Sequence, residues 1–158
     1  MRAALPPLFA IALAFAAPAY AQEATDDRAD VTATVTAFMA AFEAKDGAAM
    51  SALLTEDAYL AWVRENEGGD PTQSMRLADM ASGIGDIPAR IAEPLAIHSV
   101  MVDGPVAMVW ADYGFYLDGA LTHCGVDIFT LMQVAGDWKI ATITYSHETR
   151  ACEDAPTL

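Results

Sequence analysis

Basic residues are scarce in this sequence of 158 residues, which holds 8 Lys and Arg against 22 Asp and Glu. The formal net charge is −14 at pH 7. A surface with this excess of acid repels phosphate backbones and anionic lipid head groups. Nucleic acids and membrane surfaces are therefore excluded as partners, and the charge is typical of a protein kept soluble outside the cytoplasm. A cationic substrate stays open.

Sequence features that carry well-known chemistry are also missing. The chain has no Gly-rich phosphate-binding loop, no Ser-His-Asp arrangement and no Asn-X-Ser/Thr glycosylation sequon. It has no internal repeat, no low-complexity segment and no linker. The length then suits one domain with a single core. Any chemistry must come from side chains that the fold brings together.

Apolar runs long enough to span a membrane are lacking too. The run over residues 8–17 is too short to cross as a helix. It follows Arg2 and precedes Ala19-Tyr20-Ala21, a small-x-small pattern. We predict a secretory signal peptide over residues 1–21, cut after Ala21, and an exported protein, periplasmic or extracellular. The folded domain is expected over residues 22–150.

Cysteine is limited to two residues, Cys124 and Cys152. Export permits a disulfide between them, and we predict one. Closing this loop would restrict the unfolded chain by about 3–4 kcal/mol. The alternative, two unlinked thiols in a strand and in a tail, stays open. Residues 151–158 have no pattern and are expected to form a loose C-terminal tail.

Helices are predicted in the first half of the chain. A first helix begins near the capping residue Thr25 and ends near Gly47. Asp46 is expected to cap a second, short helix through residues 50–54. The apolar stripe of the first helix, at spacings of i, i+4, i+7, i+8 and i+11, consists of Val31, Val35, Phe38, Met39 and Phe42.

Strands dominate the rest of the sequence. A short strand is expected over residues 58–63, followed by a polar loop and a third helix, capped at Thr72 or Ser74 and running through residue 80. Asp-Gly pairs at 103–104 and 118–119 mark two hairpin turns. The long strands are expected over residues 95–102, 106–117, 121–134 and 138–147. The order indicates an α+β fold with helices packed on one face of a mostly antiparallel sheet.

This organisation resembles the nuclear transport factor 2-like superfamily, a cone-shaped fold with three N-terminal helices on a curved sheet. The segment 136–146, Gly-Asp-Trp-Lys-Ile-Ala-Thr-Ile-Thr-Tyr-Ser, is similar to the Gly-x-Trp-x-Ile ending of its SnoaL-like branches. The segment 123–131, His-Cys-Gly-Val-Asp-Ile-Phe-Thr-Leu, looks closest to the putative lumazine-binding branch. The superfamily includes steroid isomerases, polyketide cyclases, epoxide hydrolases, dehydratases and binding modules, so the resemblance implies a fold and no single function.

Turn lengths predict the strand register, and the register predicts the two faces of the sheet. A two-residue turn at 118–119 places Trp110 opposite Asp127 and Gly114 opposite His123. A three-residue turn at 135–137 places Asp127 opposite Tyr145. One face then carries aromatic and ionisable side chains, namely Met108, Trp110, Asp112, Tyr116, His123, Asp127, Phe129, Ile143, Tyr145 and His147.

The other face is apolar and, if solvated, would form a large exposed patch. Its members are Val109, Tyr113, Phe115, Thr122, Cys124, Val126, Ile128, Met132, Trp138, Ile140 and Thr142. In the family that the sequence resembles, helices cover the concave face and the convex face often meets another subunit. We therefore assign the first face to a ligand cavity and the second to a homodimer contact. The opposite assignment stays open, because a register error of one residue exchanges the faces.

Asp127 is the leading candidate for chemistry, because an acid between Val126 and Ile128 is costly to bury without a partner. With a raised pKa it could act as a general base, and Tyr145 could polarise a carbonyl group. The alternative is a structural carboxylate that accepts hydrogen bonds from Tyr145 or Trp110. The remaining candidate ligand-binding residues on the cavity face are Trp110, Asp112, Tyr116, His123, Phe129 and His147.

His123, His147 and Asp112 could form a metal site, but their spacing fits no compact ligand motif, and we interpret the two histidines as hydrogen-bonded or exposed residues at the cavity rim. His98 is expected on the opposite face in a structural role. No cofactor is expected. Two functions remain: a binding module for a small apolar or aromatic molecule, or a cofactor-free isomerase, cyclase or hydratase that acts through Asp127 and Tyr145. A third possibility, a structural partner of another protein, requires a pocket filled by its own side chains.

Overall fold

The computed structural model describes residues 19–64 and 72–158, with side chains from residue 27 on. Residues 1–18 of the predicted signal peptide lie outside the described residues. No helix in the described part of the chain is long and apolar enough to cross a membrane. The elements are α1 (Ala19–Glu43), α2 (Gly47–Ala52), β1 (Leu54–Arg64), β2 (Thr72–Arg76), α3 (Leu77–Gly83), the 3-10 turn η1 (Ile84–Asp86), β3 (Ile91–Ala92), β4 (Leu95–Asp103), β5 (Val106–Leu117), β6 (Ala120–Val134) and β7 (Asp137–His147).

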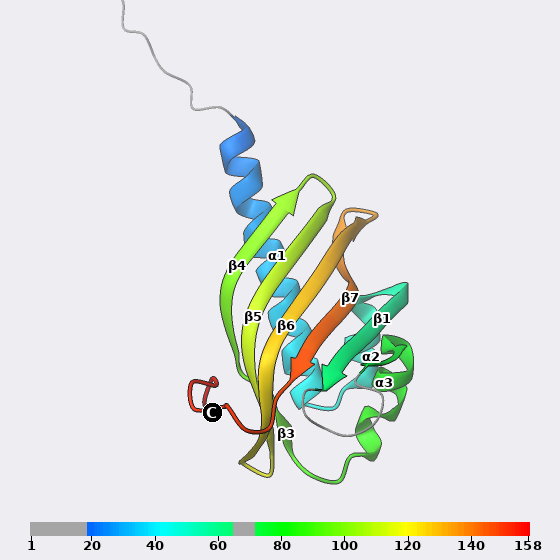
Figure 1. Cartoon of the computed structure of the whole chain (residues 1–158). Helices are drawn as coiled ribbons and strands as arrows, with labels where there is room; N and C mark the ends of the chain where they lie inside the picture. The colour runs from blue at the N-terminus through cyan, green and yellow to red at the C-terminus, as the bar shows by residue number, and fades with distance from the viewer. Residues whose placement is uncertain (1–18, 65–71) are drawn as a thin grey trace, which may run out of the picture.

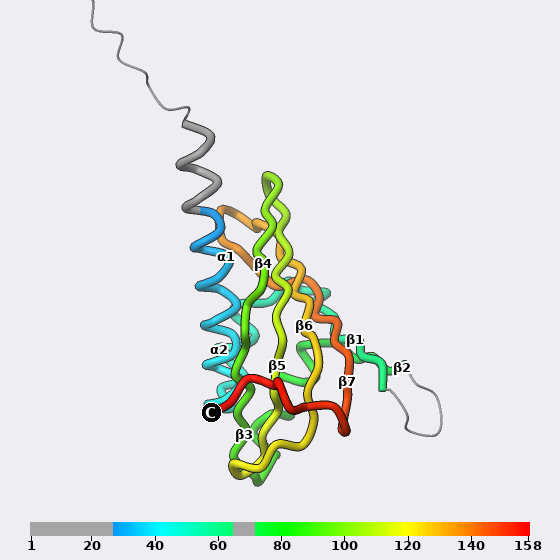
Figure 2. Tube along the Cα trace, turned by 60° about the vertical axis from the view of Figure 1, so that its left-hand side comes forward, coloured from blue at the N-terminus to red at the C-terminus, as the bar shows by residue number. Residues whose placement is uncertain are grey.

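The strands form one curved sheet in the order β2-β1-β7-β6-β5-β3, with β4 also paired to β5. β1 and β7 run parallel, and the other pairs are antiparallel. Figures 1 and 2 show α1 lying across one side of this sheet, with α2 and α3 beside β1. The predicted α+β class and three-helix arrangement are confirmed.

The core lies between α1 and the sheet. Val31, Val35 and Phe38 of α1 are buried in one cluster with Leu131 and Ile140 of the sheet. The helix stops at the predicted place, where Lys45 takes a left-handed conformation with φ of 57°. Asp46 then caps α2 as predicted, since its side chain accepts a hydrogen bond from the Ala49 amide.

The predicted start of the third helix is wrong. Thr72 and Ser74 lie in β2, which pairs with β1, and α3 begins at Leu77 after Arg76, without a side-chain cap. Here the hydrogen-bond ladder along β1 outweighs the local capping preference. β1 itself starts at Leu54, earlier than predicted, because it pairs in parallel with β7.

Two β-bulges set the register of the long strands. Between β6 and β7, Val134 pairs with Asp137 through a two-residue turn, and a shift between Thr130 and Leu131 restores the predicted pairing of Asp127 with Tyr145. Between β5 and β6, the predicted turn at 118–119 is present, but a shift between Phe115 and Tyr116 moves every pair beyond it by one residue. A bulge inserts an unpaired residue, so the side chains beyond it change face relative to the partner strand.

Because of the bulge between Phe115 and Tyr116, the residues of β5 face the opposite way from the prediction. Trp110 pairs with Ile128 and Gly114 with Cys124, whereas Asp127 faces Ala111 and His123 faces Phe115. Trp110 and Asp112 therefore lie on the outer face, and the prediction that they line the cavity is wrong. Conversely, Tyr113 and Phe115 point inward.

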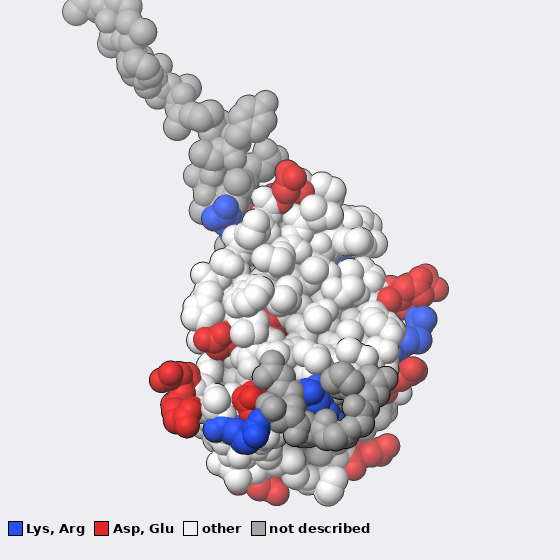
Figure 3. Space-filling model, viewed as in Figure 1, with Lys and Arg blue, Asp and Glu red and all other residues white. Residues whose placement is uncertain are grey.

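Because of the bulge between Thr130 and Leu131, the face predicted for the homodimer contact also differs. Trp138 and Ile140 are buried in the core, so the prediction that they form an outer association face is wrong. The outer face is instead apolar around Met101, Trp110 and Met132, which are 59%, 40% and 49% exposed. Figure 3 looks onto this face and shows a mostly uncharged surface, with acidic and basic side chains mainly toward the margins.

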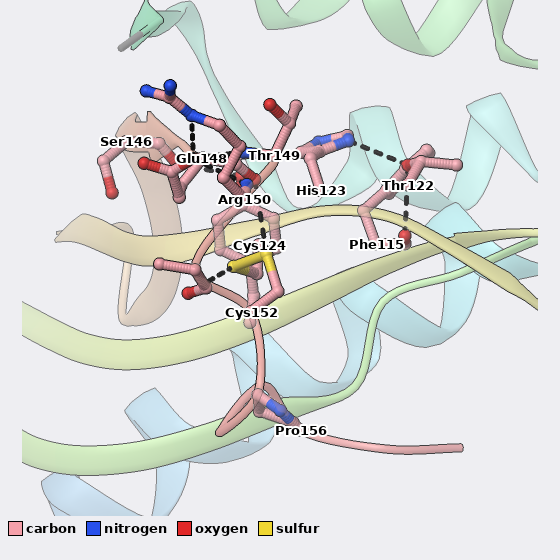
Figure 4. The surroundings of a disulfide bond; sticks show 12 residues. Phe115, Thr122, His123, Cys124, Ser146, Glu148, Thr149, Arg150, Cys152 and Pro156 are labelled. Carbon is pink, nitrogen blue, oxygen red and sulfur yellow. Dashed lines mark hydrogen bonds and ion pairs between the residues drawn. A yellow bond between two sulfur atoms is a disulfide. The ribbon is translucent and has the colours of Figure 1, made fainter. Parts of the chain in front are cut away.

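The C-terminal segment returns to the sheet after β7. The predicted disulfide between Cys124 and Cys152 is present, and Figure 4 shows it beside the end of β7. The backbones of Cys124 and Glu148 exchange two hydrogen bonds of 2.9 Å. Further along, the Tyr116 hydroxyl donates to the Pro156 carbonyl oxygen at 3.0 Å. Residues 148–156 are thus tied to β5 and β6.

Removing the disulfide should lower the free energy of unfolding. The two cysteines are separated by 28 residues, and closing a loop of that length restricts the unfolded chain by about 3–4 kcal/mol. We expect a loss of that order for the Cys124→Ser/Cys152→Ser variant in urea unfolding. A reductant should produce the same loss in the natural sequence and no change in the variant. Equal stability of both forms would contradict this account.

Candidate functional site

The inner face of the sheet encloses a cavity of about 240 Å³ beneath α1 and α3. Its wall is almost entirely apolar or aromatic. It also contains two carboxyl groups, those of Glu93 and Asp127, and the imidazole of His123. The other lining residues are Phe38, Met39, Phe42, Leu60, Trp62, Met75, Met80, Ile84, Ile87, Tyr113, Phe115, Phe129, Ile143 and Tyr145.

Aromatic rings form one side of the cavity because alternate residues of neighbouring strands face inward. Trp62 lies opposite Tyr145 in the parallel β1–β7 pair, and the two rings stack at 5.6 Å with an angle of 9°. Tyr113 meets the edge of Tyr145 at 5.9 Å. These contacts fix the rings and leave flat surfaces suited to an aromatic or apolar guest.

Asp127 lines the cavity and is 3% exposed. Its Oδ2 atom has no hydrogen-bond donor in the part of the chain that the structure describes. Neither of the partners proposed from the sequence supplies one: Trp110 lies on the outer face, and Tyr145 makes ring contacts instead. The Asp127 carboxyl instead lies within hydrogen-bonding reach of the Glu93 carboxyl.

Glu93 reaches this position from the two-residue link between β3 and β4. Both strands pair with β5, through Ala92 with Tyr116 and Leu95 with Tyr113, so the link is held against the inner face. Glu93 was not among the residues predicted for the site. The available signal was a single acid in the apolar stretch Ile-Ala-Glu-Pro-Leu over residues 91–95, which resembles an ordinary loop acid.

The Asp127–Glu93 pair binds a proton more tightly than isolated carboxyls do. Burial raises the pKa of Asp127 to about 7, and the hydrogen bond with Glu93 opposes part of this rise. Burial, followed by the charge of Asp127, raises the pKa of Glu93 well above its usual range. A hydrogen bond between two carboxyls needs one proton, and two carboxylates in one apolar site repel. The pair therefore titrates as a unit and keeps a shared proton in weakly acidic solution.

Two tyrosines next to the pair stay protonated. Burial raises the pKa of Tyr145 to about 12 and that of Tyr113 further. Tyr113 donates to the Ser146 carbonyl oxygen at 2.9 Å and is structural. Tyr145 pairs with Asp127 across the strands and lines the cavity, so it can serve as a donor to a guest.

His123 and His147 lie against each other, and His123 lines the cavity. Their rings stack at 4.1 Å with an angle of 19°, and His123 also contacts Phe115 at 4.7 Å. Burial, then the charges of His147 and Arg64, lower the pKa of His123 to about 4. His123 lines the cavity, whereas His147 stacks on it and is not among the described lining residues.

Of the other predicted site residues, Phe129 lies in the cavity, whereas Tyr116 and Asp112 lie outside it. Phe129 lines the cavity as predicted. Tyr116 bonds to Pro156 away from the cavity, so its predicted position is wrong. Asp112 binds His98 at 2.7 Å on the outer face, where His98 was expected. Asp112 therefore does not meet His123 and His147, and the described residues contain no cluster of three potential metal ligands.

Asp127 should make stability depend on pH. Folding raises its pKa from about 3.9 to about 7, so its contribution is complete below about pH 4 and is lost as the pH rises through 7. Between pH 5 and 8 the free energy of unfolding should fall more steeply for the natural sequence than for Asp127→Asn, by a few kcal/mol at about 1.4 kcal/mol per unit. Urea unfolding at each pH measures this slope.

The exposed variant Asp137→Asn serves as the control for this measurement, because it removes one negative charge outside the cavity. It should keep the slope of the natural sequence. If Asp127→Asn also keeps that slope, the buried carboxyl pair does not hold a proton at weakly acidic pH.

Solved structures with the same architecture support the fold assignment. A protein of unknown function from Shewanella baltica OS155, described as NTF2-like, superposes with a TM-score of 0.63 at 15% identity, covering 78% of this chain and 95% of that one. A putative dehydratase from the NTF2-like family of Streptomyces avermitilis gives 0.61 at 23% identity, covering 78% and 96%. An NTF2-like protein with a cystatin-like fold from Novosphingobium aromaticivorans gives 0.63 at 16% identity, covering 82% and 86%.

At these identities the likeness shows the nuclear transport factor 2-like fold and nothing of function. No protein of curated function matches the chain. The sequence does match the family described as "Putative lumazine-binding" over residues 26–146, which is most of the chain and confirms the resemblance inferred from residues 123–131. The chain therefore belongs to the family described as putative lumazine-binding.

Proposed function

We propose that this protein is an exported binding domain for a small molecule with an aromatic or apolar body and at least one polar group. The observation that carries this proposal is the apolar cavity with two unpartnered polar atoms in its wall. Asp127 Oδ2 lacks a donor and Trp62 Nε1 lacks an acceptor within the described residues. A buried polar group left unpaired costs about 1–3 kcal/mol, which a ligand that pairs it recovers.

The size of the cavity limits the guest. An apolar cavity of about 150 Å³ is known to hold benzene. The space here is about 240 Å³, which leaves room for one ring with a substituent or for two fused rings. The stacked pair of Trp62 and Tyr145 offers such a ring a parallel aromatic neighbour.

Export is part of the proposal and is supported by two features. The sequence of residues 1–21 has the pattern of a signal peptide. The disulfide between Cys124 and Cys152 is of the kind that persists in oxidising compartments.

Binding of a neutral aromatic probe tests the proposal. Cinnamamide carries one ring and one amide that can pair both unsatisfied atoms, and we expect it to change the fluorescence of Trp62 in a saturable way. Trp62→Phe should remove this signal, whereas Trp110→Phe, on the outer face, should leave it. Native mass spectrometry of protein purified from its own host should also show a retained small molecule. Absence of saturable binding together with a ligand-free mass would count against the proposal.

A second function is favoured by the carboxyl pair. Asp127 and Glu93 share a proton inside an apolar pocket, so one can accept a proton while the other donates one. Tyr145 lines the same cavity, and in this proposal its hydroxyl donates to a carbonyl oxygen. A cofactor-free isomerase, cyclase or hydratase needs these roles, with Asp127 as base and Tyr145 as electrophilic donor.

Proton exchange tests this second function without a known substrate. The probe is 2-tetralone, a bicyclic ketone whose α-protons exchange slowly in deuterated buffer. We expect the protein to accelerate this exchange at pH 7, and Asp127→Asn to reduce the acceleration by about 10²–10⁴-fold, the usual contribution of a positioned base. Asp112→Asn, on the outer face, is the control. If both variants exchange at the natural rate, Asp127 is not a base for such carbonyl compounds.

We also propose that the outer face of the sheet forms a homodimer contact. The face is apolar around Met101, Trp110 and Met132, and a second copy would cover it with an identical surface. Such faces rarely stay solvated in a monomer. The contact differs from the one expected from the sequence, because Trp138 and Ile140 lie inside.

Sedimentation equilibrium tests the dimer. The natural sequence should sediment with twice the mass of one chain. Trp110→Glu should shift the equilibrium toward monomer by placing a charge in the contact, whereas Ser82→Glu on α3 should not. A monomeric natural protein would exclude this arrangement.

A further inference from the structure

Near neutral pH the described wall of the cavity carries negative charge and no positive charge. The lining residues include neither lysine nor arginine. Burial holds the pKa of His123 at about 4, so this imidazole is neutral at pH 7. Glu93 and Asp127 keep one negative charge even while they share a proton. The charge that a guest meets in this cavity is therefore that of the carboxyl pair.

The carboxyl pair is in place before any guest arrives. Asp127 is 3% exposed, and its Oδ2 atom has no donor among the described residues. Glu93 is held beside it by the link between β3 and β4, where the Gly114 amide donates to the Pro94 carbonyl oxygen at 3.4 Å. Folding has already removed the Asp127 carboxyl from water, so a donor that enters the cavity gains a hydrogen bond there without that cost.

Trp62, Tyr145 and Asp127 lie in one row across three neighbouring strands. Trp62 pairs with Tyr145 between β1 and β7, and Tyr145 pairs with Asp127 between β7 and β6. Neighbouring strands are about 4.8 Å apart, so the backbone positions of Trp62 and Asp127 are separated by roughly 10 Å. A guest that touches both the stacked rings and the carboxyl pair has one ring system and a polar group on a short chain.

We infer that the ligand is an aromatic amine cation, whose protonated amino group binds Asp127 and Glu93 while its ring lies against Trp62 and Tyr145. An ammonium group has three donors and no acceptor, which suits a site formed by two carboxyls. The neighbouring tyrosine rings add cation–π attraction. This inference rests on the proposed binding function and specifies its ligand class.

A cation also relieves the unfavourable electrostatics of the pair. Burying a charge is costly unless it is paired, and the pair offers a partner of opposite sign. When the amine binds, the shared proton passes to solvent, and the ammonium then lies between two carboxylates that would otherwise repel each other. The formal net charge of −14 favours the approach of cations over that of anions.

Three probes with the same ring and chain length but different charge test the inference: cinnamylamine, cinnamyl alcohol and trans-cinnamate. Their affinities are measured at pH 8 by titration calorimetry. We expect the amine to bind about tenfold more tightly than the alcohol, or better, because its hydrogen bonds are charge-assisted. Cinnamate should bind most weakly, since it places a third carboxylate in the same cavity.

Variants locate the cation. Asp127→Asn and Glu93→Gln should each remove most of the difference in affinity between the amine and the alcohol. Asp137→Asn removes one exposed negative charge outside the cavity and should keep that difference, which separates the pair from the general charge of the surface. A cooperative urea transition shows that each variant is folded.

The pH dependence of binding tests the natural sequence without any substitution. The other titratable groups that line the cavity are Tyr113, Tyr145 and His123, and the charge of Arg64 acts on the last two. Burial raises the pKa of both tyrosines and lowers that of His123 to about 4, so these three keep their charge between pH 6 and 8. The pKa of Asp127 is about 7, and protons therefore compete with the amine in this range. Affinity for the amine should fall by up to about tenfold from pH 8 to pH 6, and affinity for the alcohol should not fall.

The outcomes separate this inference from the proposed function. Equal binding of the amine and the alcohol, or an amine affinity that does not fall between pH 8 and 6, overturns the inference and leaves the binding proposal standing. Tightest binding of cinnamate overturns it as well. If none of the three probes binds, the proposed function fails, and the inference fails with it.

Discussion

Two single-residue bulges decide which side chains of this protein reach its cavity. Side chains of a strand alternate between faces, so one unpaired residue exchanges the faces of everything beyond it relative to the neighbouring strand. The bulge between Phe115 and Tyr116 turns Tyr113 and Phe115 inward and Trp110 outward. The bulge between Thr130 and Leu131 turns Trp138 and Ile140 into the core while Tyr145 stays opposite Asp127. The cavity, the core and the outer face all depend on these two irregularities.

The second constraint is the burial of two acids under α1 and α3. Burying ionised groups is costly unless they are paired, and two carboxyls reduce the cost by sharing one proton. The rings of Tyr113 and Tyr145 line the same cavity as the pair and meet edge to face at 5.9 Å. A site of this kind reduces stability at neutral pH, which a fold tolerates most readily where function requires it. Binding and proton transfer are both compatible with such a pair.

Much of the architecture could be predicted from local patterns. The helical stripe of α1, the Asp46 cap and the Asp118-Gly119 turn depend on neighbouring residues, and each is found where the sequence placed it. The pairing of Asp127 with Tyr145 was also predicted, although its assumed turn was one residue too long and the bulge compensated. Periodicity does not reveal bulges, because an inserted residue changes only the pairing and not the composition.

The site was predictable only in part. Asp127, His123, Phe129 and Tyr145 stood out as polar or aromatic residues on one face, and they do line the cavity. Glu93 did not stand out, because its contact with Asp127 depends on a two-residue link whose flanking strands, β3 and β4, both pair with β5. Trp110 and Asp112 were misplaced by the bulge in the β5–β6 pair. Contacts between distant segments thus account for both kinds of error.

The disulfide has a consequence for motion at the cavity. Strand ends and chain termini normally open first, because few contacts hold them. Here β7 ends at His147, next to Glu148, whose backbone bonds to that of Cys124, and Cys124 follows His123. The covalent link to Cys152 therefore closes the region where fraying would otherwise begin. The two stacked imidazoles lie between a continuous sheet and a covalent cross-link, so local opening there requires distortion of the sheet and not merely release of a loose end.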